Sequence, residues 1–258
     1  MDRLIYTLLS GMRSRTAAQT VTANNIANAS TPGFRRELTS QVSQYLGNSR
    51  AQAQGSVTTA AMEPGKILST GEPLDIAVDG EGWLAVQAED GSEAYTRRGD
   101  LRVAATGLLE TGDGHPVLGN TGPVTVPPGG TVSIAHDGTV SVVPVGGINA
   151  VLVDRIRLVN PDPATLRKAN DGLFRTPTRS APDIKVALHV GALESSNVQV
   201  ASVLADMVEQ SRGHVDGVAV AVVAEFHDLA MGQGHLQADE ARQDCRAAVR
   251  GRRSGHRF

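Results

Sequence analysis

One group of acidic residues lies close enough together in the sequence to suggest hydrolytic chemistry. Its members are Asp75, Asp79, Glu81 and Asp90. Glycoside hydrolases use two carboxylates, one as the acid and the other as the base or nucleophile. Asp79 and Asp90 each precede a glycine, however, and Asp-Gly is typical of the tight turns between antiparallel strands. Strand turns therefore explain these two residues, and we expect no catalytic carboxylate pair.

Other patterns of catalysis and ligand binding are absent from the sequence. The seven histidines are dispersed, and none is paired with a second histidine or a cysteine at the spacing of metal ligands. Residues 80–82 read Gly-Glu-Gly, but they lack the third glycine and the following helix of a phosphate-binding loop. No nucleophile elbow is found either. We therefore predict that the chain is not an enzyme and binds no cofactor and no metal ion.

The composition argues against two further classes of partner. With a formal net charge of −3, the chain gives no reason to expect nucleic acid as a ligand. No segment approaches the roughly 18 continuous apolar residues of a membrane span, so no membrane insertion is expected. Hydrophobic residues make up 40% of the chain and aromatic residues only 3%, so a core must rest mainly on Val, Leu, Ile and Ala.

Three side-chain amides have a spacing that suits recognition rather than catalysis. Asn24, Asn25 and Asn28 lie near the end of an amphipathic helix that we predict from about residue 3 to about residue 29. The apolar side of this helix includes Ile5, Leu8, Met12 and Ile26. A buried amide must find hydrogen-bond partners, so amides beside an apolar seam can fix the register between packed helices. The alternative is that Asn28 only helps to close the helix and the other two amides face water.

A sharp corner follows this helix. It is formed by Ser30, Thr31, Pro32, Gly33 and Phe34. Proline cannot continue a helix and pushes the residue before it toward extended geometry, so Thr31 is expected outside the helix. Gly33 allows a turn that Phe34 can anchor by burial. Residues 1–36 thus form a helix with its corner, and the polar residues 37–72, with few apolar anchors, are predicted to be an extended connector.

From Pro73 the pattern of apolar residues changes from helical to alternating. Asp-Gly recurs at residues 79, 90, 113, 137 and 171, with short runs of β-branched residues between these dipeptides. Such dipeptides supply the positive φ that tight turns between antiparallel strands need. We therefore predict an antiparallel β domain over residues 73–190, in which Trp83 is a core anchor.

A second amphipathic helix is predicted over residues 191–212. Its apolar stripe consists of Val200, Leu204, Met207 and Val208 at helical spacing. The two helices at opposite ends of the chain each have an apolar stripe to bury. The expected fold class is therefore α+β, with N- and C-terminal amphipathic helices that pack together as a coiled-coil-like pair and flank the central antiparallel β domain.

The segment ANNIANASTPGFR, placed after an N-terminal amphipathic helix, resembles the signature of the bacterial flagellar axial proteins, which are the subunits of the rod and the hook. The opening MDRLIYT, the NASTPGF form of the corner and the later GWLAVQ most resemble the proximal rod branch of this family. The long stretch from PLDIAVDG to HPVLG is similar to the β core that hook and rod subunits share, and ESSNV is similar to the start of their C-terminal helix.

The resemblance implies a structural subunit of the flagellar basal-body rod, located in the periplasm and exported without a cleaved signal peptide. The implied partners are the flagellar export apparatus, other rod subunits and further copies of the chain in a helical assembly that transmits torque from motor to hook. The two apolar stripes and the three amides would form the assembly interface. Two alternatives are a distal rod subunit and a periplasmic β-domain enzyme or glycan-binding module whose helices are only packing arms.

After Arg212 the resemblance fails. Gly213 and Gly217 each weaken a helix by roughly 1 kcal/mol relative to alanine, and a β-branched run and an arginine-rich end follow them. Our hypothesis is that the reading frame shifted near the codon for Arg212, so that residues 213–258 form an atypical tail. The alternative is genuine divergence with a disordered basic end.

Overall fold

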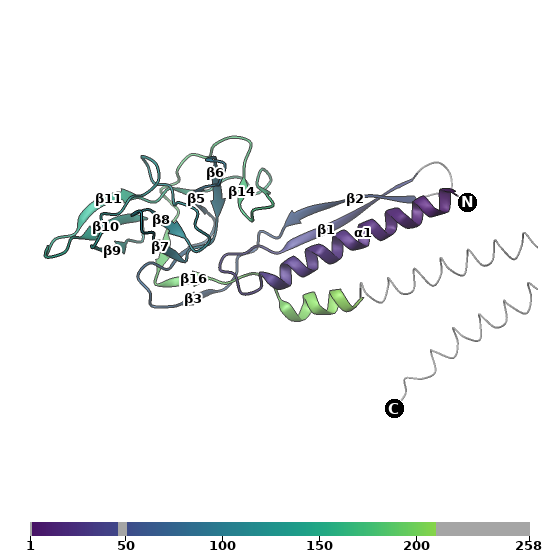
Figure 1. Cartoon of the computed structure of the whole chain (residues 1–258), viewed down its shortest axis with the longest axis horizontal. Helices are drawn as coiled ribbons and strands as arrows, with labels where there is room; N and C mark the ends of the chain where they lie inside the picture. The colour runs from purple at the N-terminus through teal and green to yellow at the C-terminus, as the bar shows by residue number, and fades with distance from the viewer. Residues whose placement is uncertain (1, 46–50, 210–258) are drawn as a thin grey trace, which may run out of the picture.

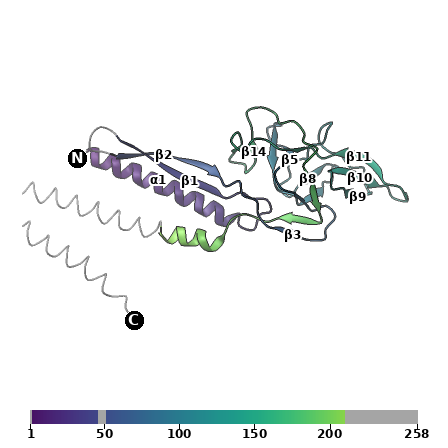
Figure 2. The same ribbon diagram turned by 180° about the vertical axis from the view of Figure 1, so that it is seen from behind.

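The computed structural model describes residues 2–45 and 51–209. Helix α1 (Asp2–Ala27) lies beside a hairpin of β1 (Glu37–Tyr45) and β2 (Ala51–Ala60), and we call these three elements the arm. The other strands gather at the far end of the elongated molecule, beyond the corner that follows α1 (Figure 1). Seen from behind, the arm again extends away from the β domain (Figure 2).

The face of α1 that is buried within the chain is small and polar. Ser14, Ala18, Thr22 and Asn25 recur at three and four residues and are each less than 10% exposed. The Thr22 hydroxyl donates to the carbonyl oxygen of Ala18, whereas the buried Ser14 hydroxyl has no hydrogen-bond partner among the described residues. Among the described helices, none is long and apolar enough to cross a membrane.

The predicted fold class, in which two terminal helices form a coiled-coil-like pair around the β domain, is wrong. Strands dominate the described chain, and its C-terminal helical segment covers only residues 200–209. The packing partner that the structure shows for α1 is the β1–β2 hairpin. The reason is that residues 37–60, which the sequence predicts to be part of a connector, pair their backbones over almost their whole length.

Every strand pair of the β domain among the described residues is antiparallel. The largest sheet has the order β12-β5-β6-β14-β13 and consists of β5 (Trp83–Gln87), β6 (Glu93–Thr96), β12 (Leu158–Val159), β13 (Arg167–Lys168) and β14 (Phe174–Arg175). A second sheet has the order β11-β10-β9 and consists of β9 (Thr131–Ile134), β10 (Thr139–Val143) and β11 (Val151–Arg155).

Three two-stranded sheets complete the β domain. They pair β4 (Ile76–Val78) with β15 (Leu188–Val190), β3 (Ile67–Ser69) with β16 (Ala192–Glu194), and β7 (Leu101–Val103) with β8 (Leu109–Thr111). The first two pairs join residues near 70 to residues near 190, so they close the β domain next to the arm. The glycines of the five Asp-Gly dipeptides all have positive φ, between 64° and 89°, as the turn prediction requires.

The β domain has a core in two parts. The larger cluster contains only Val, Leu, Ile and Ala among its fully buried members, as the low aromatic content predicts. The smaller cluster is built around Trp83, Tyr95 and Phe174. The Trp83 side chain is 5% exposed, and its ring centroid lies 4.6 Å from that of Phe174, so the prediction that Trp83 is a core anchor is confirmed.

Replacing Gly99 with alanine should destabilise the β domain, because a methyl group there would lie 1.7 Å from the carbonyl oxygen of Ile76. We expect the free energy of unfolding to fall by about 1–3 kcal/mol or more, as for other overpacked sites. Urea denaturation of the full chain measures this change.

Gly147→Ala is the matched control, because its added methyl group would meet only Pro144, at 3.3 Å and beyond. An exposed substitution of this kind should change the free energy of unfolding by no more than about 0.5 kcal/mol. Equal midpoints for the two variants would contradict the close approach at Gly99.

Candidate functional site

Three segments of the chain meet between the arm and the β domain, and we call this region the neck. They are residues 33–36 at the end of the corner and just after it, residues 61–66 after β2, and residues 194–197 at and after the end of β16. The amide nitrogen of Gly33 donates to the carbonyl oxygen of Glu194 at 2.7 Å, and that of Ser195 donates to Lys66 at 2.8 Å. The segments that lead into and out of the β domain are therefore bonded to each other at one place.

The corner is a close contact between the arm and the β domain. Gly33 has a φ of +67°, and a methyl group on it would lie 2.3 Å from the carbonyl carbon and oxygen of Arg97. Only glycine fits this backbone conformation and this contact without strain. The Thr31 hydroxyl donates to the side-chain oxygen of Asn28 at 3.2 Å, whereas Ser30 is exposed. Pro32 and Phe34 are half-buried.

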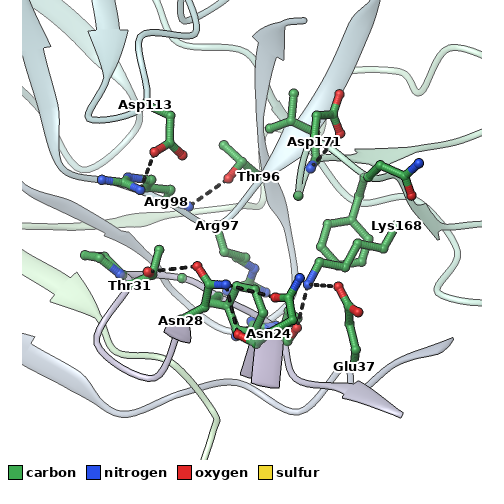
Figure 3. Close-up of a pocket in the computed structure, with 18 residues that line it drawn as sticks. Asn24, Asn28, Thr31, Glu37, Thr96, Arg97, Arg98, Asp113, Lys168 and Asp171 are labelled. Carbon is green, nitrogen blue, oxygen red and sulfur yellow. Dashed lines mark hydrogen bonds and ion pairs between the residues drawn. The ribbon is translucent and has the colours of Figure 1, made fainter. Parts of the chain in front are cut away.

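Asn25 joins the helix to the hairpin. Its amide nitrogen donates to the carbonyl oxygen of Glu37, and its side-chain oxygen accepts from the Glu37 amide nitrogen, both at 2.8 Å. The side chain is 4% exposed, so this closed pair of bonds satisfies a buried amide within the chain. The Asn28 amide donates to the side-chain oxygen of exposed Asn24 at 2.9 Å (Figure 3). A role for these amides in the register between helices stays a prediction.

Three buried charges form the centre of the neck. One carboxylate oxygen of Glu194 forms an ion pair with Arg35. The other oxygen forms an ion pair with Nη1 of Arg97 at 3.1 Å. The side chains of the three residues are 0%, 5% and 1% exposed for Arg35, Arg97 and Glu194 respectively. The oxygen that binds Arg35 also accepts a hydrogen bond from the amide nitrogen of Gly65 at 2.7 Å. One carboxylate thus contacts the corner, the segment after β2 and the β domain.

Two guanidinium groups share this single carboxylate, and other groups offset the remaining positive charge. Arg97 donates to the carbonyl oxygens of Val78 and Gly80 at 3.3 and 2.7 Å. The guanidinium carbons of Arg35 and Arg97 lie 5.8 and 5.4 Å from the centroid of the Trp83 ring, whose face attracts cations. Burial lowers the pKa of Arg97, and the Glu194 carboxylate opposes this shift.

Lys168 on β13 makes a second ionic contact between the β domain and the arm. Its Nζ atom lies 2.9 Å from a carboxylate oxygen of Glu37, donates to the carbonyl oxygen of Arg35 at 3.0 Å, and lies 3.8 Å from the centroid of the Phe34 ring (Figure 3). Burial lowers the pKa of Lys168, and the bond to Glu37 opposes the shift. The corner is therefore held by cations of the β domain on two sides.

Asn197 joins the neck segments through hydrogen bonds to backbone atoms. Its side-chain oxygen accepts from the Arg36 amide nitrogen at 2.6 Å, and its amide nitrogen donates to the carbonyl oxygens of Ala61 and Glu63 at 3.1 and 2.8 Å. Sequence reasoning missed Asn197, Glu194 and Arg35, because partners about 160 residues apart leave no local pattern. The only signal was their position inside the two quoted motifs, GFR and ESSNV.

A polar hollow of about 360 Å³ lies beside the neck (Figure 3). Its lining residues are Asn24, Asn28, Thr31, Pro32, Gly33, Phe34, Arg35, Glu37, Thr96, Arg97, Arg98, Asp113, Lys168, Asn170, Asp171, Gly172, Leu173 and Phe174. Its charges are paired, either within the lining, as Arg98 is with Asp113, or with a residue outside it, as Asp171 is with Arg175. Within the described residues no group of three or more His, Cys, Asp or Glu side chains could hold a metal ion. The arrangement suits recognition and rigidity.

The carboxylates that first suggested hydrolysis serve turns and surface contacts. Asp90 accepts hydrogen bonds from the backbone and the hydroxyl of Ser92, and these bonds lower its pKa. A general acid of the glycosidase kind needs a raised pKa instead. Asp75 accepts from the Thr70 hydroxyl at 2.7 Å, and Asp79 lies 3.4 Å from the ring of His189 at the surface.

The apolar stripes of both ends are largely uncovered. Met12 is 47% exposed, and Val200, Leu204 and Val208 are 43%, 47% and 51% exposed. Ile26 and Met207 are half-buried, and the side chains of Ile5 and Leu8 lie outside the described residues. A folded chain thus leaves apolar surface on the arm and on residues 200–209.

Comparison with known proteins gives matches over the N-terminal helix with its corner and over the β domain. Residues 5–35 match the family described as "Flagella basal body rod protein", and residues 77–142 match the "Flagellar hook protein FlgE/F/G D1 domain". The chain is 40% identical over 226 residues to the flagellar basal-body rod proteins FlgF of Salmonella typhimurium and Escherichia coli, which covers 82% of this chain and 90% of each relative. It is 34% identical to FlgF of Caulobacter vibrioides, over 83% of this chain and 90% of that relative.

Replacing Asn197 with alanine should loosen the neck, because three hydrogen bonds to backbone atoms are lost at once. At about 1 kcal/mol per bond, we expect the free energy of unfolding to fall by about 2–3 kcal/mol. Urea denaturation of the full chain gives the value, and limited proteolysis shows whether cleavage begins near residues 33–36.

The control is Asn160→Ala, which removes an exposed amide in the β domain. This variant should match the unchanged chain in both assays. If Asn197→Ala behaves like Asn160→Ala, Asn197 does not hold the neck together.

Proposed function

The chain belongs to the family of flagellar basal-body rod proteins, and we propose how its structure serves the rod. It is a structural subunit of the flagellar basal-body rod, and its likeness to FlgF fits the proximal rod. It assembles with other rod and hook subunits. The distal rod is the alternative within the family.

The exposed apolar stripes are the observation that supports assembly through the two ends of the chain. Burying one aliphatic side chain contributes about 1.5–3 kcal/mol, so Met12, Val200, Leu204 and Val208 together offer an upper bound of about 6–12 kcal/mol. Contacts that run head to tail without closing generate a helical shaft. In such a shaft the arm packs near the axis, and the β domain, held rigidly by the neck, sets the spacing between subunits.

The proposed role is mechanical. The subunit transmits torque along the rod toward the hook, and the charged side chains of the polar hollow, which are held in ion pairs, give no reason to assign it catalysis. The proposal includes delivery by the flagellar export apparatus without a cleaved signal peptide.

Residues 213–258 lie outside the described residues, and the proposal of a shifted reading frame near Arg212 stands on the sequence. The FlgF relatives match 82–83% of this chain, which leaves room for an unmatched end of about this length. Peptide mass spectrometry of detergent-purified basal bodies should find peptides from residues 1–212 and, if the frame shifted in the record, none from residues 213–258. Absence of all peptides from intact basal bodies would contradict the rod assignment.

Leu204→Asp should impair assembly, because it places a charge in the exposed stripe of residues 200–209. Swimming in soft agar and the yield of complete basal bodies should both fall strongly, while the urea midpoint of the purified chain stays unchanged, since Leu204 is 47% exposed.

The matched control is Ala205→Asp, an exposed neighbour outside the predicted stripe, which should swim normally. Normal swimming and full basal bodies with Leu204→Asp would remove this side chain from the assembly interface.

A further inference from the structure

We propose that Glu194 fixes the angle between the arm and the β domain, because its carboxylate binds one arginine from each. This inference rests on the proposed function, since a subunit that transmits torque must not bend at the neck. Arg35 stands between the corner and β1, whereas Arg97 follows β6 of the largest sheet. Each arginine takes a different oxygen of Glu194, so neither bond excludes the other.

Because the three charges are buried together, the neck can close only when all three are present. In the closed neck these side chains are 0%, 5% and 1% exposed, so their charges depend on protein partners rather than on water. If the arm swung away, Arg35 would leave an oxygen of Glu194 that only the Gly65 amide still satisfies. The closed arrangement is therefore a discrete state rather than one of many similar angles.

The hydrogen bonds of Asn25 and Asn197 connect different parts of the molecule from those that the ion pairs of Glu194 connect. Asn25 bonds helix to hairpin inside the arm, and Asn197 bonds the corner to residues 61–63. Neither side chain reaches Arg97 or the largest sheet in these bonds. Lys168 holds the corner from the other side, but it acts on Glu37 and Phe34 at the base of the arm. Glu194 is the side chain that ties both arginines.

The fluorescence of Trp83 should report in solution whether the neck is closed. It is the single tryptophan of the chain, and both guanidinium groups lie over its ring at 5.8 and 5.4 Å. One of these cations belongs to the arm and the other to the β domain. Loss of Arg35 from the ring should therefore shift the emission of Trp83 even when the β domain stays folded.

Arg35→Met is the decisive variant, because it removes the arm's charge and leaves Glu194 and Arg97 paired. Spin labels are placed at Gln19→Cys on α1 and Lys185→Cys in the β domain, both exposed positions, in a full chain that carries Cys245→Ser. Double electron–electron resonance then measures the distance between arm and β domain. We expect Arg35→Met to widen the distance distribution about twofold and to shift Trp83 emission, with the urea midpoint of the β domain unchanged.

Two further variants complete the test. Arg36→Met is the matched control, because Arg36 forms no ion pair among the described residues, and it should keep the narrow distribution. Glu194→Gln leaves two buried guanidinium groups without a carboxylate and should widen the distribution further. It should also lower the β-domain midpoint, because Arg97 loses its ion pair, and adding Arg35→Met should restore only part of that loss.

An unchanged distance distribution in Arg35→Met, with unchanged Trp83 emission, would overturn the proposal. These measurements use the purified chain, so they stand or fall independently of the rod. Swimming and basal-body yield of the same variants test the proposed function. A wide distribution with normal swimming would keep the role of Glu194 in the neck and reject the need for a rigid neck in the rod.

Discussion

The structure depends on burying a carboxylate between two arginines at a point where four segments of the chain meet. A buried charge is tolerated only when its partners arrive together, and here Arg35, Arg97 and the Gly65 amide meet the carboxylate of Glu194. The two glycines at this point, Gly33 and Gly65, let backbones approach where any side chain would collide. The close packing of backbones at Gly33 and Gly65 thus accompanies the pairing of the Glu194 carboxylate with both arginines.

On either side of this point the chain uses different means of stability. The β domain buries a continuous aliphatic core and needs no help from other molecules to exclude water from it. The arm keeps small and polar side chains on its inner face, and its larger apolar side chains, such as Leu9 and Met12, point to solvent. An arm built in this way leaves apolar surface exposed, which other subunits would cover in the proposed assembly.

The sequence predicts local features well where a residue type forces one geometry. Pro32 and Gly33 define the corner, and the Asp-Gly dipeptides define turns, because few residues accept these backbone angles. The hairpin of β1 and β2 was missed because its strands are small and polar, so backbone pairing rather than an alternating apolar pattern holds it together. The expected helix pair failed for the related reason that the inner face of α1 carries Ser14, Ala18 and Thr22. The bonds of Glu194 and Asn197 were out of reach, since they join residues that only the fold brings together.

Residues 200–209 leave the neck on the same side as α1 (Figures 1 and 2). The whole β domain is thus an insertion between two segments whose ends are fixed to each other by the Gly33, Glu194 and Asn197 bonds. An insertion with fixed ends can grow, shrink or be exchanged without moving the segments that flank it. The β domain of such a subunit can therefore change in size or be replaced by another domain grafted at the same two positions, while the arm and residues 200–209 keep their places.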